Sequence, residues 1–398
     1  MTAPPKLRLF DFTMIVISLV IGMGIFRTPV NVARDAPSEF VFFAAWLAGG
    51  VVALCGALTY AEIGCRMPVT GGYYKIFSYA YHPSIAFGVN CLILVSNAAS
   101  LAGVALIGGE YITGVFIPEM KDVEWLKIAA NASYTRTIQM VIAVVAIAIF
   151  YGVNLLGLKM SARTQSVLMV IKIILILLLI APLFFATGDA EPVRLVKSLS
   201  PTMNEYIKAF GIGLVAVSFT YGGYQQTINF GAEVKDPNKN IPRGIFLGIF
   251  TIIVLYLTIN YAYIKVIGFE NLKESKNIAA IMASKLFGTN AERILSSFLF
   301  LSVLAYVNVL LMSNPRVMYA MSEDKILPAS FKKTNPRTGA LVTSLTVFAV
   351  LCALIVFWAK EFDTILSFSI FLDCFGMILS AGAIFILRKK TAHLNGTG

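Results

Sequence analysis

The chain has 398 residues, of which 58% are apolar and only 13% are charged, and its formal net charge is +11. Soluble domains carry about 25% charged residues, so this composition excludes a mostly water-exposed protein. It predicts a multi-pass membrane protein, embedded in the lipid bilayer as a single transmembrane domain over residues 1–398. No water-facing domain offers a basic patch, so we expect no nucleic-acid partner.

Histidine and cysteine usage argues against metal or redox chemistry. The five cysteines lie in or beside apolar runs without metal-ligand spacing, and the two histidines, His82 and His393, fall outside the predicted spans. A membrane enzyme would need a nucleophile with a base, or metal ligands, inside the membrane. We therefore expect no cofactor, no metal and no enzymatic activity.

Apolar windows near 20 residues mark ten candidate spans. The first begins a few residues from the N-terminus, and no small-residue cleavage site follows it, so we interpret it as a span and not as a signal peptide. The predicted spans are 10–33, 39–62, 83–115, 136–154, 163–187, 207–231, 243–268, 291–320, 339–358 and 364–387.

Lysine and arginine set the expected orientation. Summed over the N-terminus and every second connection from there they outnumber acidic residues, but summed over the connections between they do not. Both termini are therefore expected in the cytoplasm, and the protein in the plasma or inner membrane. The Lys/Arg-rich segments after the N-terminus are 63–82, 155–163, 232–243, 316–338 and 388–398.

The first span is interrupted at its middle by Gly22-Met23-Gly24. Glycine admits backbone conformations closed to other residues, and an interrupted helix exposes amide groups that can hold a carboxylate. The carbonyls that end the inner half-helix, near Ile21, can accept a hydrogen bond from an ammonium group. The alternative is small-residue packing between helices.

A second interruption, at Gly222-Gly223, falls in the sixth span. Two Gly-broken spans at matching places in two halves point to a transporter whose substrate site lies between them. Five spans is an odd number, so the halves 10–187 and 207–387 would be inverted relative to each other. Helices that leave their hydrogen-bond pattern inside lipid must line a cavity or be covered by protein.

Two charged residues fall at mid-membrane depth. Lys172 lies about ten residues into the fifth span, roughly 15 Å deep, where a lysine must face the interior or extend to the membrane edge. Asp373, in the tenth span, is a candidate proton site, a partner for Lys172 or a structural acceptor. Asn97 and Asn308 are uncharged polar groups inside spans; they can line a pocket or bond between helices.

Four stretches resemble the amino acid–polyamine–organocation transporters, most of all their L-amino acid transporter branch. They occur in the family's order and together cover residues from about 10 to 390. The stretches are IGMGIF, YAEIGCRMPVTGGYYKIF, FTYGGYQQTINFGAEVKDPNKNIPRGI and VNVLLMSNPRVMYAMSEDKILP.

The resemblance implies an all-α, five-plus-five inverted-repeat fold like that of the bacterial leucine transporter, with discontinuous helices 1 and 6. It implies that the substrate carboxylate lies at the first break and that carbonyls of both breaks take the α-amino group. Phe219 would close the site from outside. The implied substrate-binding residues are Ile21, Gly22, Met23, Gly24, Ile25, Phe219, Tyr221 and Gly222.

Lys172 matches a lysine of sodium-independent members that stands in the place of a sodium ion. Tyr306 departs from the pattern, because related members often carry a small residue or serine there, facing that lysine. The family usually has twelve spans, and helices 11 and 12 are absent from this chain, which is either naturally short or truncated. Segment 116–136 has no cysteine, so no disulfide-linked heavy chain is expected.

These observations predict a sodium-independent exchanger of neutral L-amino acids that works by alternating access. The alternatives within transport are a proton-coupled symporter and a carrier of polyamines or cationic amino acids. Cationic substrates would need an acid in the pocket, and Asp373 is the mid-membrane candidate. An ion channel is disfavoured because broken helices suit a substrate-sized site better than a pore.

Overall fold

The computed structural model describes residues 7–22, 24–116, 132–185, 202–275, 278–288, 291–358 and 362–390. This described part is helical, and its β-contacts are isolated bridges. The long helices are α3 (Glu39–Arg66), α5 (Pro83–Phe116), α7 (Ala132–Leu155), α8 (Leu158–Ile180), α10 (Met203–Thr220), α11 (Pro237–Ile267), α14 (Ala291–Glu323), α15 (Val342–Trp358) and α16 (Phe362–Lys390).

Shorter helices connect them. They are α1 (Leu9–Val20), α2 (Thr28–Asp35), α4 (Gly72–Ala80), α9 (Pro182–Phe185), α12 (Phe269–Glu274) and α13 (Ile278–Phe287), with 3-10 turns at Gly24–Phe26, Tyr224–Asn229, Gly231–Glu233 and Ala329–Lys332. Helices overlap all ten predicted windows.

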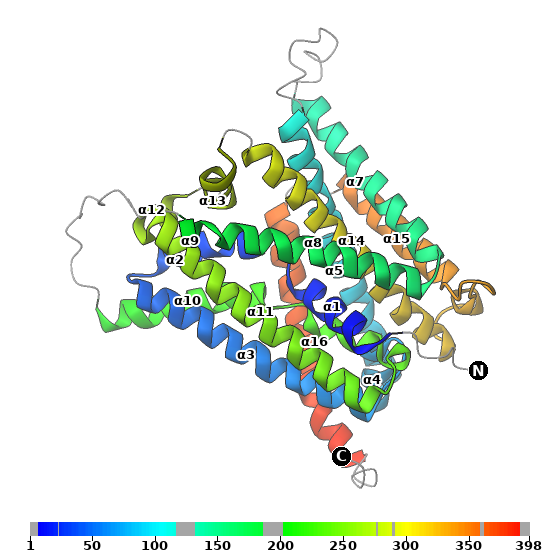
Figure 1. The fold of residues 1–398 in the computed structure, drawn as a ribbon. Helices are drawn as coiled ribbons and strands as arrows, with labels where there is room; N and C mark the ends of the chain where they lie inside the picture. The colour runs from blue at the N-terminus through cyan, green and yellow to red at the C-terminus, as the bar shows by residue number, and fades with distance from the viewer. Residues whose placement is uncertain are drawn as a thin grey trace.

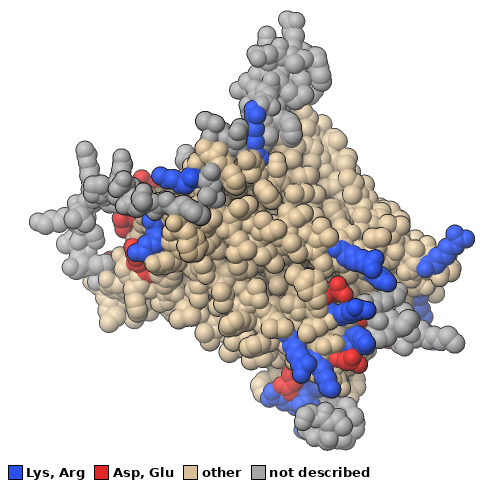
Figure 2. Space-filling model, in the orientation of Figure 1, with Lys and Arg blue, Asp and Glu red and all other residues tan. Residues whose placement is uncertain are grey.

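Among the described residues, six helices are long and apolar enough to cross a membrane. They are α3, α5, α7, α8, α11 and α14, and α1 and α15 are shorter apolar helices. On the face in Figure 2, charged side chains gather at opposite ends of the molecule, and few interrupt the surface between them. An apolar belt between two charged rims is the surface expected of a multi-pass membrane protein.

Helix α1 lies at the centre of the molecule. It packs against α11 on one side and α8 on another, and it also contacts α14 and the 3-10 turn after α10 (Figure 1). Helices α3, α10 and α11 run side by side, and α14 packs along α5, α8 and α7. The central helix is thus covered by neighbours, so backbone groups freed at its end are shielded from lipid.

Local sequence explains where α1 begins and ends. The Arg8 N–H donates to the Asp11 carboxylate, so an acid in the first turn caps the helix. After Val20 the helix stops, and the Gly22 N–H donates back to the Val20 carbonyl at 2.8 Å. The next α-helix, α2, begins at Thr28 with a proline in its first turn, where a missing N–H costs nothing.

Helix α10 ends in a similar sequence context. Its start is closed by a capping box between Thr202 and Glu205. Its end is followed by Gly223, whose φ of +110° favours glycine because other residues meet steric clashes there. The 3-10 turns follow, and α11 begins at Pro237.

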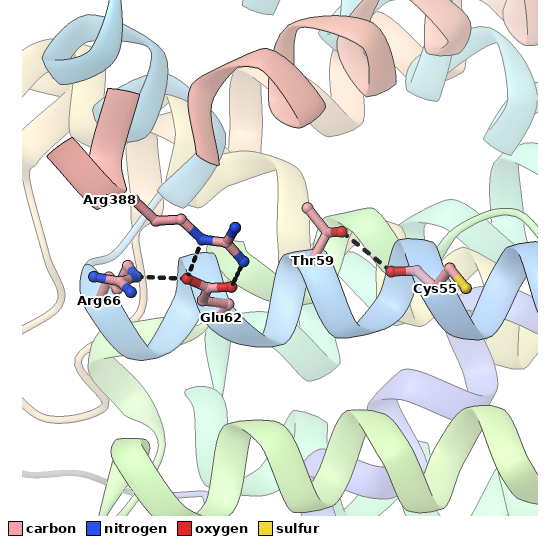
Figure 3. A network of polar contacts seen from close by, with 5 residues as sticks. All are labelled: Cys55, Thr59, Glu62, Arg66 and Arg388. Atoms are coloured by element: carbon pink, nitrogen blue, oxygen red, sulfur yellow. Dashed lines mark hydrogen bonds and ion pairs between the residues drawn. The ribbon is translucent and has the colours of Figure 1, made fainter. Parts of the chain in front are cut away.

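At one rim, an ion-pair network ties α3 to α16 (Figure 3). The Arg388 guanidinium donates to both carboxylate oxygens of Glu62, at 2.8 and 2.5 Å, and Arg66 donates to the same carboxylate at 2.8 Å. This two-point geometry is the strongest form of an arginine–carboxylate contact. It joins residues 326 positions apart in sequence and links the end of α16 to α3.

Candidate substrate site

The ends of α1 and α10 lie beside each other. The Thr220 hydroxyl donates to the Thr28 hydroxyl at 2.7 Å, which links the last residue of α10 to the first residue of α2. The Tyr256 hydroxyl, on α11, lies 3.5 Å from the Val20 carbonyl and 3.4 Å from the Thr220 carbonyl. A single buried hydroxyl therefore lies against the last carbonyl of both helices.

The two glycines of the first interruption have different surroundings. A Cβ added at Gly24 would lie 2.9 Å from the Thr220 side chain, so Gly24 permits close packing. A Cβ added at Gly22 would meet nothing within 4 Å. Gly22 does not have a positive φ, so the expectation that it permits a special backbone conformation is wrong for this residue. Met23, between them, lies outside the described residues.

Lys172 reaches the first interruption from α8. Its side chain is 1% exposed, and its Nζ donates to the Ile21 carbonyl at 2.7 Å. Ile21 is the C-cap residue directly after α1, so the ammonium group bonds a carbonyl left free by the helix end and compensates the negative end of the helix dipole. The alternative that Lys172 extends to the membrane edge is wrong in this structure.

Residues of the second interruption lie beside the end of α1. Gly222 is partly buried, and its N–H donates to the Phe219 carbonyl at 2.9 Å. Tyr221 is fully buried, and its ring packs against those of Trp46 and Tyr256, with centroids 6.1 and 5.0 Å away. The structure thus brings Phe219, Tyr221 and Gly222 to the end of α10, which faces the end of α1.

Asn97 and Asn308 hold helices together in two separate networks. Asn97 donates to Asn314 at 2.7 Å and accepts from Gln226 at 3.0 Å, which joins α5, α14 and the turn after α10. Asn308 donates to the Gln165 side-chain oxygen at 2.6 Å and accepts from Asn154 at 2.9 Å. Both asparagines therefore make hydrogen bonds between helices, which is one of the two roles that the sequence suggested for them.

Neither Tyr306 nor Asp373 is bonded to Lys172 in the described residues. The Tyr306 hydroxyl pairs with the Ser100 hydroxyl at 2.8 Å, not with the lysine. The Asp373 carboxylate lies within electrostatic reach of the hydroxyls of Tyr306, Tyr60 and Tyr73. Among the described residues no ion pair joins Asp373 to Lys172, so their pairing is not found in this structure.

A cavity of about 670 Å³, which we call the vestibule, opens at the rim. An ion pair between Arg316 and Glu233, at 2.9 Å, lies in its wall. Lys75 also lines the cavity, and it pairs with Asp324 outside the lining at 2.5 Å. Its lining comes from Pro68–Thr70, the ends of α7 and α14, the start of α8, and residues between 332 and 345. In the described residues, no group of three or more metal-ligating side chains occurs there or elsewhere.

The model of the amino acid permease family matches residues 7–397 of this chain. The chain belongs to the amino acid permease family. The permease is therefore a transporter and not an enzyme, as the sequence predicted, and the family assignment agrees with the resemblance found in its motifs.

Named relatives of the permease support amino acid transport. It is 28% identical to the serine/threonine exchanger SteT of Bacillus subtilis (strain 168), an alignment that covers 96% of this chain and 83% of the relative. It is 26% identical to the human cystine/glutamate transporter over 98% of this chain and 75% of the relative. It is 26% identical to the mouse large neutral amino acids transporter small subunit 2, over 94% of this chain and 69% of the relative.

Sequence reasoning missed two residues of the site in this permease. Gln165 lies two helical turns before Lys172, on the same face of α8, and its spacing was the signal that should have revealed it. Tyr256 carries no such signal, because a tyrosine in an apolar helix is common and only the packing shows which carbonyls it meets.

Proposed function

We propose that this permease is a sodium-independent exchanger of neutral L-amino acids that works by alternating access. In this proposal α1 and α2 form one discontinuous helix, α10 and the 3-10 turns after it form another, and the two belong to inverted repeats of five spans. The N-terminus lies in the cytoplasm, as the lysine and arginine distribution favours. The membrane is the plasma or inner membrane of the cell.

The observation that carries the proposal is the contact between Lys172 and Ile21. A fixed, buried ammonium group at the end of α1 occupies the place where a cation would bind free carbonyls. A second positive charge at that place would be repelled and would gain little from the same oxygen atoms. Lys172 thus supplies what a bound sodium ion would supply elsewhere, a positive charge that stabilises the helix end.

The substrate would lie against the open side of Gly22. The Gly22 N–H is already bonded to Val20, so the amides of Met23, Gly24 and Ile25 are left to hold the carboxylate. The carbonyls of Ile21, Phe219 and Tyr221 can each accept one more hydrogen bond, from the α-amino group. Phe219 and Gly222, both partly exposed, would border the substrate on the α10 side.

Exchange rather than net uptake is favoured by the relatives, since one of them is named a serine/threonine exchanger. We further propose that the permease works without a disulfide-linked heavy chain. The cysteines of the described residues are free, and segment 116–136, much of which lies outside the described part, contains none. The partners of the site are then the amino acid and the lipid bilayer.

Uptake by the purified permease in proteoliposomes tests this function. We expect labelled amino acid to enter only when an unlabelled neutral amino acid is inside, and competition among the twenty amino acids to identify the preferred side chain. Replacing sodium by choline should leave the rate unchanged. Uptake that collapses in choline would contradict sodium independence, and no exchange with any amino acid would contradict the function as a whole.

Asp373 supports a second candidate, a carrier of cationic amino acids or polyamines, or a proton-coupled symporter. A carboxylate within the membrane-spanning part of the protein can balance the positive charge of such a substrate or carry a proton. If this candidate is right, lysine or a polyamine competes better than leucine, and Asp373→Asn removes that preference. If the main proposal is right, Asp373→Asn leaves the ranking of competitors unchanged.

A further inference from the structure

The vestibule ends on side chains that belong to a buried hydrogen-bonded layer. Its lining includes Asn154 at the end of α7, Ser161 at the start of α8 and Met312 on α14. Asn154 is 8% exposed and donates to the Asn308 side chain, which is fully buried. At Asn154 and Ser161 the wall of the vestibule is thus polar but uncharged.

Asn154 is the first of three amide side chains joined in a row by hydrogen bonds, from Asn154 to Asn308 and from Asn308 to Gln165; we call Asn154, Gln165 and Asn308 the amide plug. Asn308 donates to the Gln165 oxygen at 2.6 Å and to the Ser161 carbonyl at 3.2 Å. The Gln165 amide donates to the Ala305 carbonyl at 3.0 Å. The plug therefore ties together α7, α8 and α14 in one layer.

The plug also holds α1. The Gln165 amide donates to the hydroxyl of Ser18, which is fully buried and lies one turn before the end of α1. From Gln165 to Lys172 along α8 is a rise of about 10 Å. The order from the vestibule inward is therefore the amide plug, then Ser18, then Ile21 with Lys172, and then the open side of Gly22.

We propose that the amide plug is the inner gate of this permease, which separates the vestibule from the substrate at the end of α1. The proposal rests on the substrate site proposed above. When α1 moves away from α8, the contact between Ser18 and Gln165 breaks, and the vestibule extends to Gly22. Gln165 is then a positioning residue that sets how long the gate stays closed.

The chemistry of the plug suits a gate that opens often. Neutral amide hydrogen bonds contribute only a modest net free energy, because water or a polar substrate can replace them. A buried ion pair would leave uncompensated charges when it separated, so opening would be slow. The amides also offer both donors and acceptors, which match the ammonium and carboxylate groups of a passing amino acid.

Asn260 is a matched control inside the same protein. It is fully buried on α11, and its amide donates to the Tyr256 carbonyl of its own helix at 2.7 Å. Like Asn308 it is an asparagine within a membrane helix, but in the described part of the chain its side chain makes no hydrogen bond to α1, α8 or α14. Asn260→Ala therefore removes a buried amide without touching the plug.

The test measures how fast an impermeant thiol reagent, the sulfonate MTSES, reaches a cysteine beyond the plug. Gly22→Cys places the thiol there without a steric clash, and Thr334→Cys, an exposed residue of the vestibule lining, reports access to the vestibule. The reagent is added to sealed vesicles from the side that labels Thr334→Cys. Labelling is read at each peptide by mass spectrometry, so the native cysteines stay in place.

We expect Gly22→Cys to react slowly in the otherwise native chain and about tenfold faster or more when Gln165→Ala or Asn308→Ala is added. Asn260→Ala should leave that rate unchanged, and Thr334→Cys should react equally fast in every background. The fully buried native Cys352 should stay unlabelled in every variant, which shows that the variants are folded. Equal rates at Gly22→Cys with and without the plug would overturn the proposal. Because no substrate is used, this result is independent of whether the native chain exchanges amino acids.

Discussion

The glycines that follow α1 and α10 share a sequence context but differ in what surrounds them. A Cβ at Gly22 would meet no atom within 4 Å, whereas one at Gly223 would lie 2.0 Å from the Leu19 carbonyl oxygen. Gly223 also has a φ of +110°, and Gly22 does not have a positive φ. The first interruption therefore leaves space beside the chain, and the second is a tight packing contact against α1.

This difference in packing gives the two interruptions different roles. At the first interruption, Lys172 donates to the Ile21 carbonyl, and Gly22 faces unfilled space. At the second, the Gly223 N–H donates to the Gln225 side chain at 2.7 Å, and Tyr221 is fully buried. We infer that the substrate lies at the first interruption and that the second forms its wall.

The largest expected effect is that of Gly223→Ala. A side chain at this φ costs of order 1–3 kcal/mol, and the clash with the Leu19 carbonyl adds to that cost. We expect a clear loss of thermal stability in detergent and loss of exchange together. Native-like stability in this variant would show that the second interruption is not the tight contact described above.

Gly22→Val should have a large effect on transport and little effect on the fold. Valine extends into space that the chain leaves unfilled, so stability should change by only about 0.5 kcal/mol. Exchange should be abolished, because the side chain occupies the place of the substrate. Thermal unfolding and proteoliposome exchange, measured on the same preparation, check both parts, and normal exchange in a stable Gly22→Val protein would move the site elsewhere.

Lys172→Met tests whether the contact of Lys172 with the Ile21 carbonyl stabilises the first interruption. The Ile21 carbonyl loses its donor, which costs about 1–3 kcal/mol for a buried acceptor, and we expect exchange to slow by about tenfold. If the lysine only stabilises the helix end, Lys172→Met should slow accumulation driven by a proton gradient no more than it slows exchange. Robust accumulation that disappears in Lys172→Met, with exchange intact, would instead make Lys172 a proton carrier.

The smallest effect is expected at the rim. Arg388 is about half exposed, and its contacts with Glu62 are screened by salt, so Arg388→Gln should cost at most about 1 kcal/mol. Thermal stability measured at low and high salt checks this, since the difference from the native permease should shrink as salt rises. A large loss that is independent of salt would show that the contact of α16 with α3 is part of the transport machinery.

The sequence predicted the helices well because apolar windows of this length mark membrane-spanning segments, and the observed α5 and α14 begin at the predicted residues. It also placed Lys172 inside the protein, because a charge at that depth has few alternatives. It did not separate Gly22 from Gly24, since packing across helices decides which glycine has a neighbour. The roles of Asn308 and Gln165 likewise depend on partners about 140 residues away or more.

The most direct test of the substrate site is protection of Gly22→Cys from the thiol reagent by an amino acid and by its amide. The account predicts that a transported amino acid slows labelling and that its amide, which lacks the carboxylate, protects poorly at the same concentration. Labelling that stays equally fast with saturating amino acid, or is slowed equally by the amide, would contradict a carboxylate site at the first interruption.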